Sequence, residues 1–390
     1  MFFISLQYRK MKLLIIASDI GVTAPGIVYE TLINQLAKDY EISIISPEIS
    51  TGFKTSSIKI LPSKPVGFTH LRVEKMSFEI FNRNILDDYW LLKQKLIINN
   101  DSIRCCDAVV SFVSFHNYRS LLLGNELSKK FNKPWIVYSV DAVPPPNGWG
   151  VEGSYRKNTI RFINKYIGRA DMFFSANEQM LNYQLGLLQF RPSKVGVLYT
   201  PIKPVSHSVK NRCSREIPIF LYTGGLYGPR KKNAVLDGFR LLLKHVSKAK
   251  IVFVGIGKYE KFMEYQDLLE NENLEYYDFR KDLTEFYQRA TVLIDINAYF
   301  DNDVFLSSKI VNYLPIGLPI VSVTGLNSPS RNIFTDDMSI IHCQHDAKEV
   351  CEALQRALNV DVKKEERYKY IKMFSPENVL NDFNKALKTL

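Results

Sequence analysis

Long hydrophobic runs are missing from this 390-residue sequence. None approaches the roughly 18 apolar residues that a membrane-spanning helix needs, so we expect a soluble or peripheral protein. The first ten residues are apolar and then basic, but the first predicted strand follows Met11 at once and leaves no room for a signal-peptide cleavage region. These absences indicate a cytoplasmic protein, with the inner face of the membrane as the alternative location.

Cysteine is scarce, and its spacing matches neither a metal site nor a disulfide framework, which fits a reducing compartment. We therefore expect no metal held by thiolates and no disulfide bonds. The five cysteines are Cys105, Cys106, Cys213, Cys343 and Cys351.

Positive charge is in excess, with 51 Lys and Arg residues against 40 Asp and Glu. A net charge of +11 favours anionic partners through long-range attraction. Nucleic acid is one candidate, but the cations are scattered through amphipathic stretches and no RNP, zinc-finger or helix-turn-helix pattern is present. A phosphate-rich small molecule or an anionic membrane surface fits this diffuse basicity better, and we expect no nucleic-acid partner.

Short β-branched runs alternate with amphipathic stretches twice along the chain, which predicts two Rossmann-like, doubly wound α/β domains facing a central cleft. The polar, proline-containing segment 200–218 is interpreted as the linker. The predicted domains are 1–204 and 205–375, and a last helix at 376–390 has the option of packing back onto the first. The predicted strands are 13–17, 42–46, 108–112, 135–140, 172–175 and 195–199, then 219–222, 251–254, 274–278, 292–296, 320–323 and 340–342.

The segment 220–232, FLYTGGLYGPRKK, reads as a buried strand that runs into a glycine-rich turn. Gly224 and Gly225 let backbone N–H groups approach a diphosphate closely, and three cations follow, Arg230, Lys231 and Lys232. A nucleotide-bearing ligand is the prediction.

A second motif, SSKIVNYLPIGLPIV, occupies residues 307–321. Ser307 and Ser308 are good N-caps, and the free N–H groups at the start of the helix, up to Lys309, form an anion site facing the Arg230 turn. Gly317 is suited to end this helix in the left-handed conformation.

These motifs resemble those of GT-B glycosyltransferases, family 4 in particular. TGGLYGPRKK is similar to the donor-phosphate turn of that family, which makes Arg230 the phosphate-binding cation and puts Gly225 where the commoner form has an arginine. One of the two expected cations is therefore missing, unless Lys231 or Lys232 substitutes for it. The 307–321 segment resembles the family's Ser-Lys-(Ile/Leu)-x-Glu-Tyr pattern, with Asn312 where relatives have a ribose-binding glutamate.

An upstream acid of the family would fall on Val304, with Asp301 and Asp303 beside it. Asp301 and Asp303 lie on the loop after the predicted strand 292–296, in reach of the donor sugar or the leaving diphosphate, and Asp303 is the catalytic candidate of the two. Asp301-Asn302-Asp303 also matches the Asp-x-Asp metal motif of GT-A enzymes. We disfavour that interpretation, because cations and a helix start already neutralise the diphosphate, and we expect a metal-independent protein without cofactors.

The first domain contributes weaker signals. Gly21 lies in a glycine-containing turn after the first strand, similar to the family loop that faces the donor phosphates. His116 and Asp141 each follow a predicted strand and are candidates for acceptor contact and proton handling. Relatives have a histidine where this chain has Val140. Phe279 follows a strand of the second domain, where relatives place the nucleotide base, although a core or surface role fits equally.

The resemblance implies a retaining transferase that moves a sugar from a nucleotide-diphosphate donor to a glycan or lipid-linked acceptor, in surface polysaccharide biosynthesis. The alternatives are a GT-B nucleotide-sugar epimerase, a non-catalytic GT-B binding subunit and a basic nucleic-acid binder. The amphipathic stretch 78–99 is interpreted as a packing helix, with peripheral membrane contact as its alternative role.

Overall fold

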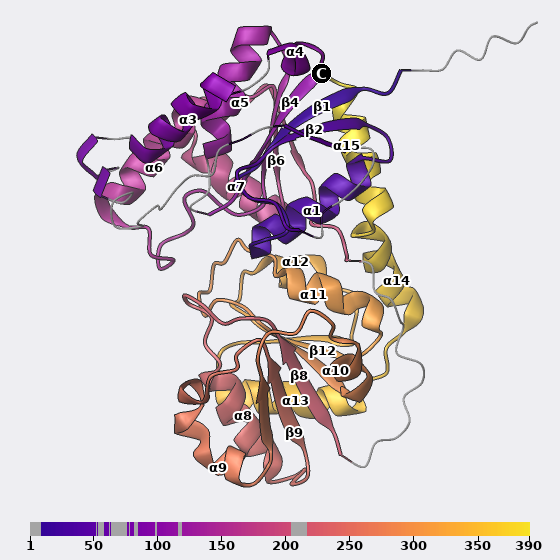
Figure 1. Cartoon of the computed structure of the whole chain (residues 1–390). Helices are drawn as coiled ribbons and strands as arrows, with labels where there is room; N and C mark the ends of the chain where they lie inside the picture. Colours follow the sequence, from indigo (N-terminus) through magenta and orange to yellow (C-terminus); the bar gives the residue numbers. More distant parts are fainter. Residues whose placement is uncertain are drawn as a thin grey trace, which may run out of the picture. The chain divides into compact units, whose positions relative to one another are not determined.

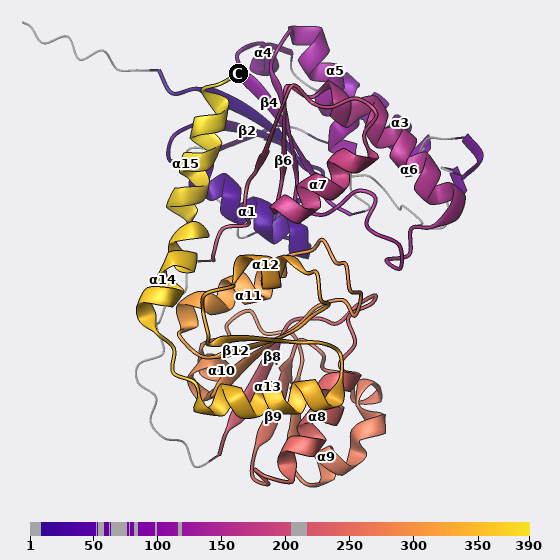
Figure 2. The same cartoon turned by 180° about the vertical axis from the view of Figure 1, so that it is seen from behind.

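The computed structural model describes residues 9–51, 53, 58–61, 63, 76–77, 79–81, 85–97, 100–115, 119–203 and 217–390. Internal packing divides the chain into two α/β units (Figures 1 and 2). Unit 1 comprises residues 1–147, 151–201 and 376–390, and unit 2 comprises residues 148–150 and 202–375. Much of the predicted linker, residues 204–216, lies outside the described residues, and so does Cys213.

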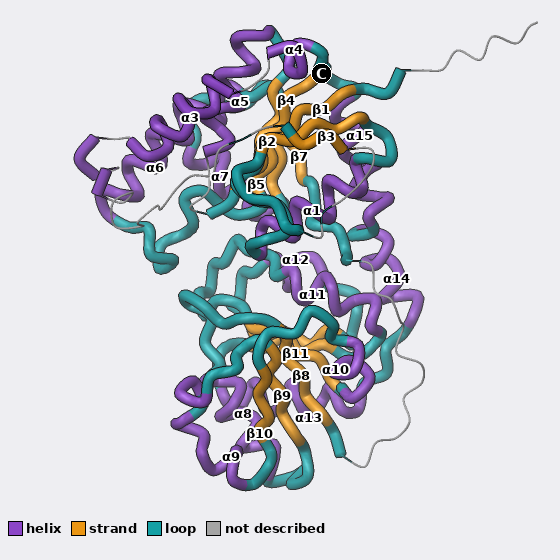
Figure 3. The backbone as a smooth tube through the Cα atoms, viewed as in Figure 1, coloured by secondary structure: helices purple, strands orange, loops and turns teal. Residues whose placement is uncertain are grey.

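In the described part of unit 1, seven parallel strands form a sheet in the order β3-β2-β1-β4-β5-β6-β7 (Figure 3). Their runs are almost entirely apolar, as expected for strands covered by helices on both faces. The strands are β1 (Lys12–Ile16), β2 (Glu41–Ile45), β3 (Ile58–Ile60), β4 (Ala108–Val113), β5 (Trp135–Ser139), β6 (Met172–Ser175) and β7 (Lys194–Val197).

Helices cover both faces of this sheet. One face packs against α3, α5 and α6, and the other against α1 and α15. Phe383 of α15 makes an edge contact with Tyr40 and stacks near Phe174, so the C-terminal helix belongs to the core of unit 1. The helices are α1 (Ala24–Leu36), α3 (Ile85–Ile97), α4 (Asn100–Arg104), α5 (Arg119–Phe131), α6 (Gly153–Tyr166), η1 (Ile167–Arg169), α7 (Glu178–Leu187) and α15 (Pro376–Leu387).

The described residues of unit 2 form a six-stranded parallel sheet in the order β10-β9-β8-β11-β12-β13. The strands are β8 (Ile219–Thr223), β9 (Lys250–Val254), β10 (Leu274–Tyr277), β11 (Val292–Ile296), β12 (Ile320–Val323) and β13 (Ile340–Cys343). The strand order reverses between β8 and β11, and in such folds ligands bind outside the carboxyl ends of the strands at this switch point.

Helices α8 and α13 pack together on one face of this sheet (Figure 2), and α10 and α11 contact strands of the same sheet. The helices are α8 (Asn233–Leu243), η2 (Tyr259–Lys261), η3 (Met263–Tyr265), α9 (Gln266–Glu270), α10 (Thr284–Arg289), α11 (Ser308–Tyr313), η4 (Leu314–Ile316), α12 (Pro329–Ile333), α13 (Ala347–Asn359) and α14 (Lys364–Met373).

The prediction of two Rossmann-like α/β units is confirmed, and every predicted strand is present within a residue or two. Strand β3, a short edge strand, was not predicted. Within the described residues, no helix combines the length and apolar character that crossing a bilayer requires.

Candidate functional site

The turn after β8 is shaped by a close approach of backbone and side chain. Gly224 has a φ of +103°, a conformation that residues with a Cβ rarely adopt. A Cβ at this position would lie 2.6 Å from Cε of Lys309. The next glycine, Gly225, has open space where its Cβ would be. The glycine-rich turn therefore brings the Lys309 side chain directly against the backbone after β8.

Arg230 lies at the end of the same turn and is tied to the loop that follows β11. Its backbone forms an antiparallel bridge with Ala298. Its guanidinium donates to the Tyr227 hydroxyl at 2.9 Å and lies over the Tyr227 ring, 4.8 Å from the centroid. This arrangement holds the guanidinium at the carboxyl ends of the two strands that form the switch point.

The start of α11 is anchored by a carboxylate within the sheet. Ser307 caps the helix by accepting a hydrogen bond from the Lys309 N–H at 3.2 Å. Its hydroxyl donates to Asp295 of β11 at 2.7 Å, and Asn297 donates to the other Asp295 oxygen at 2.7 Å. Asp295 is completely buried, so hydrogen bonds replace the water it loses on folding.

The charges of this site influence one another. Burial opposes the charge on Arg230, but the Tyr227 and Tyr222 phenols and the nearby carboxylates offset that effect and raise its pKa. Burial, with repulsion from Arg230, lowers the pKa of Lys309 to about 8, although Asp295 partly counters the shift. Burial raises the pKa of Asp303 to about 6, and Arg230 limits that rise. Two cations are thus held together beside a glycine turn, an arrangement suited to binding an oxyanion.

Helix α11 has only six residues, and η4 follows it directly. Ser308, its first residue, is exposed. Asn312, expected at the ribose, accepts a hydrogen bond from the Lys203 N–H at 3.0 Å. Gly317 has a φ of +76° at the end of η4, as expected for a helix end.

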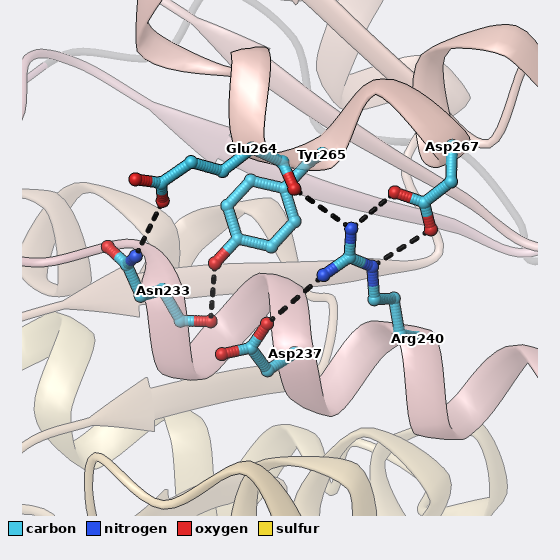
Figure 4. A network of polar contacts seen from close by, with 6 residues as sticks. All are labelled: Asn233, Asp237, Arg240, Glu264, Tyr265 and Asp267. Atoms are coloured by element: carbon cyan, nitrogen blue, oxygen red, sulfur yellow. Dashed lines mark hydrogen bonds and ion pairs between the residues drawn. The ribbon is translucent and has the colours of Figure 1, made fainter.

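Lys231 and Lys232 point to different surroundings from Arg230. Lys231 is exposed, and the Lys232 ammonium lies 5.7 Å from the Phe262 ring and 5.5 Å from the Tyr265 ring. A network between α8 and the segment 264–267 lies next to it (Figure 4), joining Asn233, Asp237, Arg240, Glu264, Tyr265 and Asp267. This network ties α8, from Asn233 to Arg240, to the segment 264–267.

The Asp-x-Asp sequence does not present two carboxylates side by side to solvent. Asp301 is exposed, whereas Asp303 is fully buried and accepts hydrogen bonds from the Val304 N–H at 2.9 Å and the Phe305 N–H at 3.4 Å. Asn302 accepts from the Asn327 side chain at 2.9 Å. Across the described part of the chain, no three His, Cys, Asp or Glu side chains gather as a metal site would require.

The remaining predicted residues lie on other elements of the two units. Phe279 follows β10 and is 73% exposed. In unit 1, the Gly21 N–H donates to the Gly26 carbonyl at 2.9 Å within the turn between β1 and α1. Asp141 follows β5 and accepts a hydrogen bond from the Phe115 N–H at 3.3 Å. His116 lies outside the described residues.

Three residues of the unit 2 site were not singled out from the sequence. Asp295 is a lone charge inside the apolar run of β11, which is the signal that would have drawn attention to it. Tyr227 lies within the glycine-rich turn. Trp149, between two glycines, lies with its ring centroid 5.6 Å from Cζ of Arg230.

No protein-family model and no curated protein matches this sequence. Solved structures of GT-B glycosyltransferases, however, match nearly the whole chain. HepE from Anabaena, crystallised with UDP and glucose, has a TM-score of 0.65 at 11% identity, covering 97% of this chain and 100% of its own. The lipopolysaccharide outer core galactosyltransferase WaaB has a TM-score of 0.62 at 14% identity, and the match covers 97% of this chain and 99% of WaaB. A glycosyltransferase from Rickettsia africae has a TM-score of 0.65 at 12% identity, and the match covers 98% of this chain and 99% of that enzyme. The chain therefore has the GT-B fold.

Proposed function

We propose that this protein is a glycosyltransferase that takes a sugar from a nucleotide-diphosphate donor and transfers it, with retention, to a glycan or lipid-linked acceptor. The observation that supports it most is the pair of cations, Arg230 and Lys309, beside the glycine turn at the β8–β11 switch point of a GT-B fold. HepE, crystallised with UDP, supports a nucleotide-diphosphate donor. WaaB, a lipopolysaccharide outer core galactosyltransferase, makes a surface glycan the setting that we favour.

In this proposal, Arg230 and Lys309 stabilise the charge that develops on the departing diphosphate. Both positions are set before the ligand arrives, by the Tyr227 hydroxyl and by the Gly224 backbone, so little reorganisation accompanies charge transfer. The acceptor hydroxyl approaches the face that the diphosphate leaves. Asp141 and His116 remain the candidates for handling its proton, and no metal ion takes part.

Donor binding and transfer are tested separately. A thermal-shift panel of UDP, GDP and their sugar derivatives should identify one stabilising nucleotide, because a ligand that binds only the folded state raises its stability. Transfer of radiolabelled sugar from that donor to lipid-linked and glycan acceptors then tests the reaction. Arg230→Ala should reduce kcat about 10²- to 10³-fold, the typical cost of losing one preorganised donor to a developing oxyanion. Near-native transfer by this variant would refute the assignment.

A non-catalytic binding subunit is the second candidate, because two acids of the resembled family are replaced here. Val304 is buried, and the Asn312 carbonyl already bonds to the Lys203 backbone. Nucleotide binding without turnover across a broad acceptor panel would favour it. An epimerase would instead convert the donor to a new sugar nucleotide in the absence of any acceptor.

Peripheral membrane contact is part of the proposal and is supported by α3. Four large apolar residues at helical spacing, Ile85, Tyr89, Leu92 and Leu96, are exposed, whereas Trp90 on the same helix is buried. An amphipathic helix of this kind binds the interface of a bilayer. Flotation with anionic vesicles should recover the native protein but not a Leu92→Glu/Leu96→Glu variant. The matched control is Tyr368→Glu on α14, which changes another exposed residue.

A further inference from the structure

A three-residue segment outside the recognised motifs contributes to the anion site of unit 2. Residues 148–150, Gly-Trp-Gly, belong to unit 2 although they lie far from its other residues in the sequence. Gly148 has a φ of +91°, and a Cβ there would lie 2.2 Å from Cζ of Phe300. Only glycine lets the chain pass Phe300 so closely, which brings Trp149 to the loops that follow β8 and β11.

The indole of Trp149 touches both of these loops. Its six-membered ring lies beside Gly228, where a Cβ would be 3.6 Å from Cε3. Its centroid is 4.7 Å from that of Phe305, in a tilted contact. The guanidinium carbon of Arg230 lies 5.6 Å from the ring, within the range of a cation–π interaction. Arg230 is therefore held between two aromatic side chains, Tyr227 and Trp149.

Two buried N–H donors in this cluster have no hydrogen-bond partner among the described residues. They are Nε1 of Trp149 and Nε of Arg230. Indole nitrogen is a donor only, and a buried donor left unpaired costs about 1–3 kcal/mol. A ligand oxygen that accepts from both groups would remove this cost, and the positive charges of Arg230 and Lys309 favour an anionic oxygen.

We infer that Trp149 is a ligand-binding residue of the donor site: its indole N–H donates to a phosphate oxygen of the bound diphosphate, while its ring holds Arg230 in place. This inference rests on the proposed function, because it names a further contact to the same leaving group. It assigns no contact to the nucleotide base, so inorganic pyrophosphate should bind through the same group.

The experiment compares the native protein with Trp149→Phe, which keeps an aromatic ring against Arg230 and Phe305 but removes the N–H. Calorimetric titrations with pyrophosphate, UDP and GDP give the affinities. Binding of each ligand that the native protein accepts should weaken about tenfold, as expected for one hydrogen bond to a charged acceptor. Trp149→Ala, which also removes the ring, should weaken binding further.

Tryptophan fluorescence supplies a second measurement. The sequence has three tryptophans, and the other two, Trp90 and Trp135, are each 2% exposed in the core of unit 1. Pyrophosphate should therefore change the emission of the native protein and leave that of Trp149→Phe unchanged. Two results would overturn the role of Trp149 and leave the proposed function standing. One is equal affinity of the native protein and Trp149→Phe for these ligands. The other is an unchanged fluorescence emission of the native protein on adding a ligand that calorimetry shows to bind. Failure of the native protein to bind any of the three ligands would overturn both.

Discussion

Lys309 makes donor binding depend on pH in a way that the structure specifies. Burial and the charge of Arg230 lower its pKa from 10.5 to about 8, so the protein without ligand loses this charge in a pH range that binding assays can reach. From the titration of a single group, about 90% of Lys309 is charged at pH 7 and about 10% at pH 9. If only the charged form binds a diphosphate well, affinity for UDP or GDP falls about tenfold over this interval.

Other groups do not produce the same change. The second pKa of a phosphate monoester is near 6, so the ligand is already about 90% ionised at pH 7 and changes little up to pH 9. Asp303, with a pKa of about 6, is also ionised above pH 7. The effect of pH on folding stability has the opposite sign to its effect on binding. Between about pH 8 and pH 10.5, Lys309 keeps its proton in the unfolded chain and has lost it in the folded one, so the folded state gains stability as pH rises.

Isothermal titration calorimetry at pH 7, 8 and 9 measures the effect. Lys309→Met should bind weakly at every pH, and Lys309→Arg should bind with little pH dependence because its charge persists. Lys248→Met, which removes an exposed lysine from the turn before β9, is the matched control and should behave as the native protein does. Native affinity that stays constant from pH 7 to 9, or a tenfold fall that persists in Lys309→Met, would refute the reasoning.

Three further predictions concern packing. Gly224→Ala should weaken nucleotide binding at least tenfold, since its Cβ would displace the lysine against it, whereas Gly225→Ala, which meets open space, should bind normally in the same titration. Phe383→Ala should lower the stability of unit 1 by about 3–5 kcal/mol in urea unfolding, while the exposed control Lys385→Ala stays within about 0.5 kcal/mol. Arg367→Met should destabilise unit 2 by about 3–5 kcal/mol, because it removes the ion-pair partner of the buried Asp337. An unchanged midpoint in urea unfolding would contradict this.

The sequence by itself determined the α/β architecture, because buried parallel strands are continuous apolar runs and the turns between them are marked by glycine and proline. Strand β3 was not predicted because it lacks such an apolar run. It has three residues, one of them the exposed Lys59, and it lies at the edge of the sheet, so no apolar run marks it. The glycine turn and the capped start of α11 were also local patterns, readable without the fold.

Only the tertiary structure decided which charges act together. Arg230, Lys231 and Lys232 are adjacent in sequence, yet Lys232 lies over Phe262 and Tyr265 while Arg230 interacts with Lys309. Burial and Coulomb interactions depend on distance through space, and the crossover connections of a parallel sheet set that distance by bringing remote strand ends together. The same principle explains why Trp149, which no sequence pattern links to Arg230, became visible as a site residue only in the folded chain.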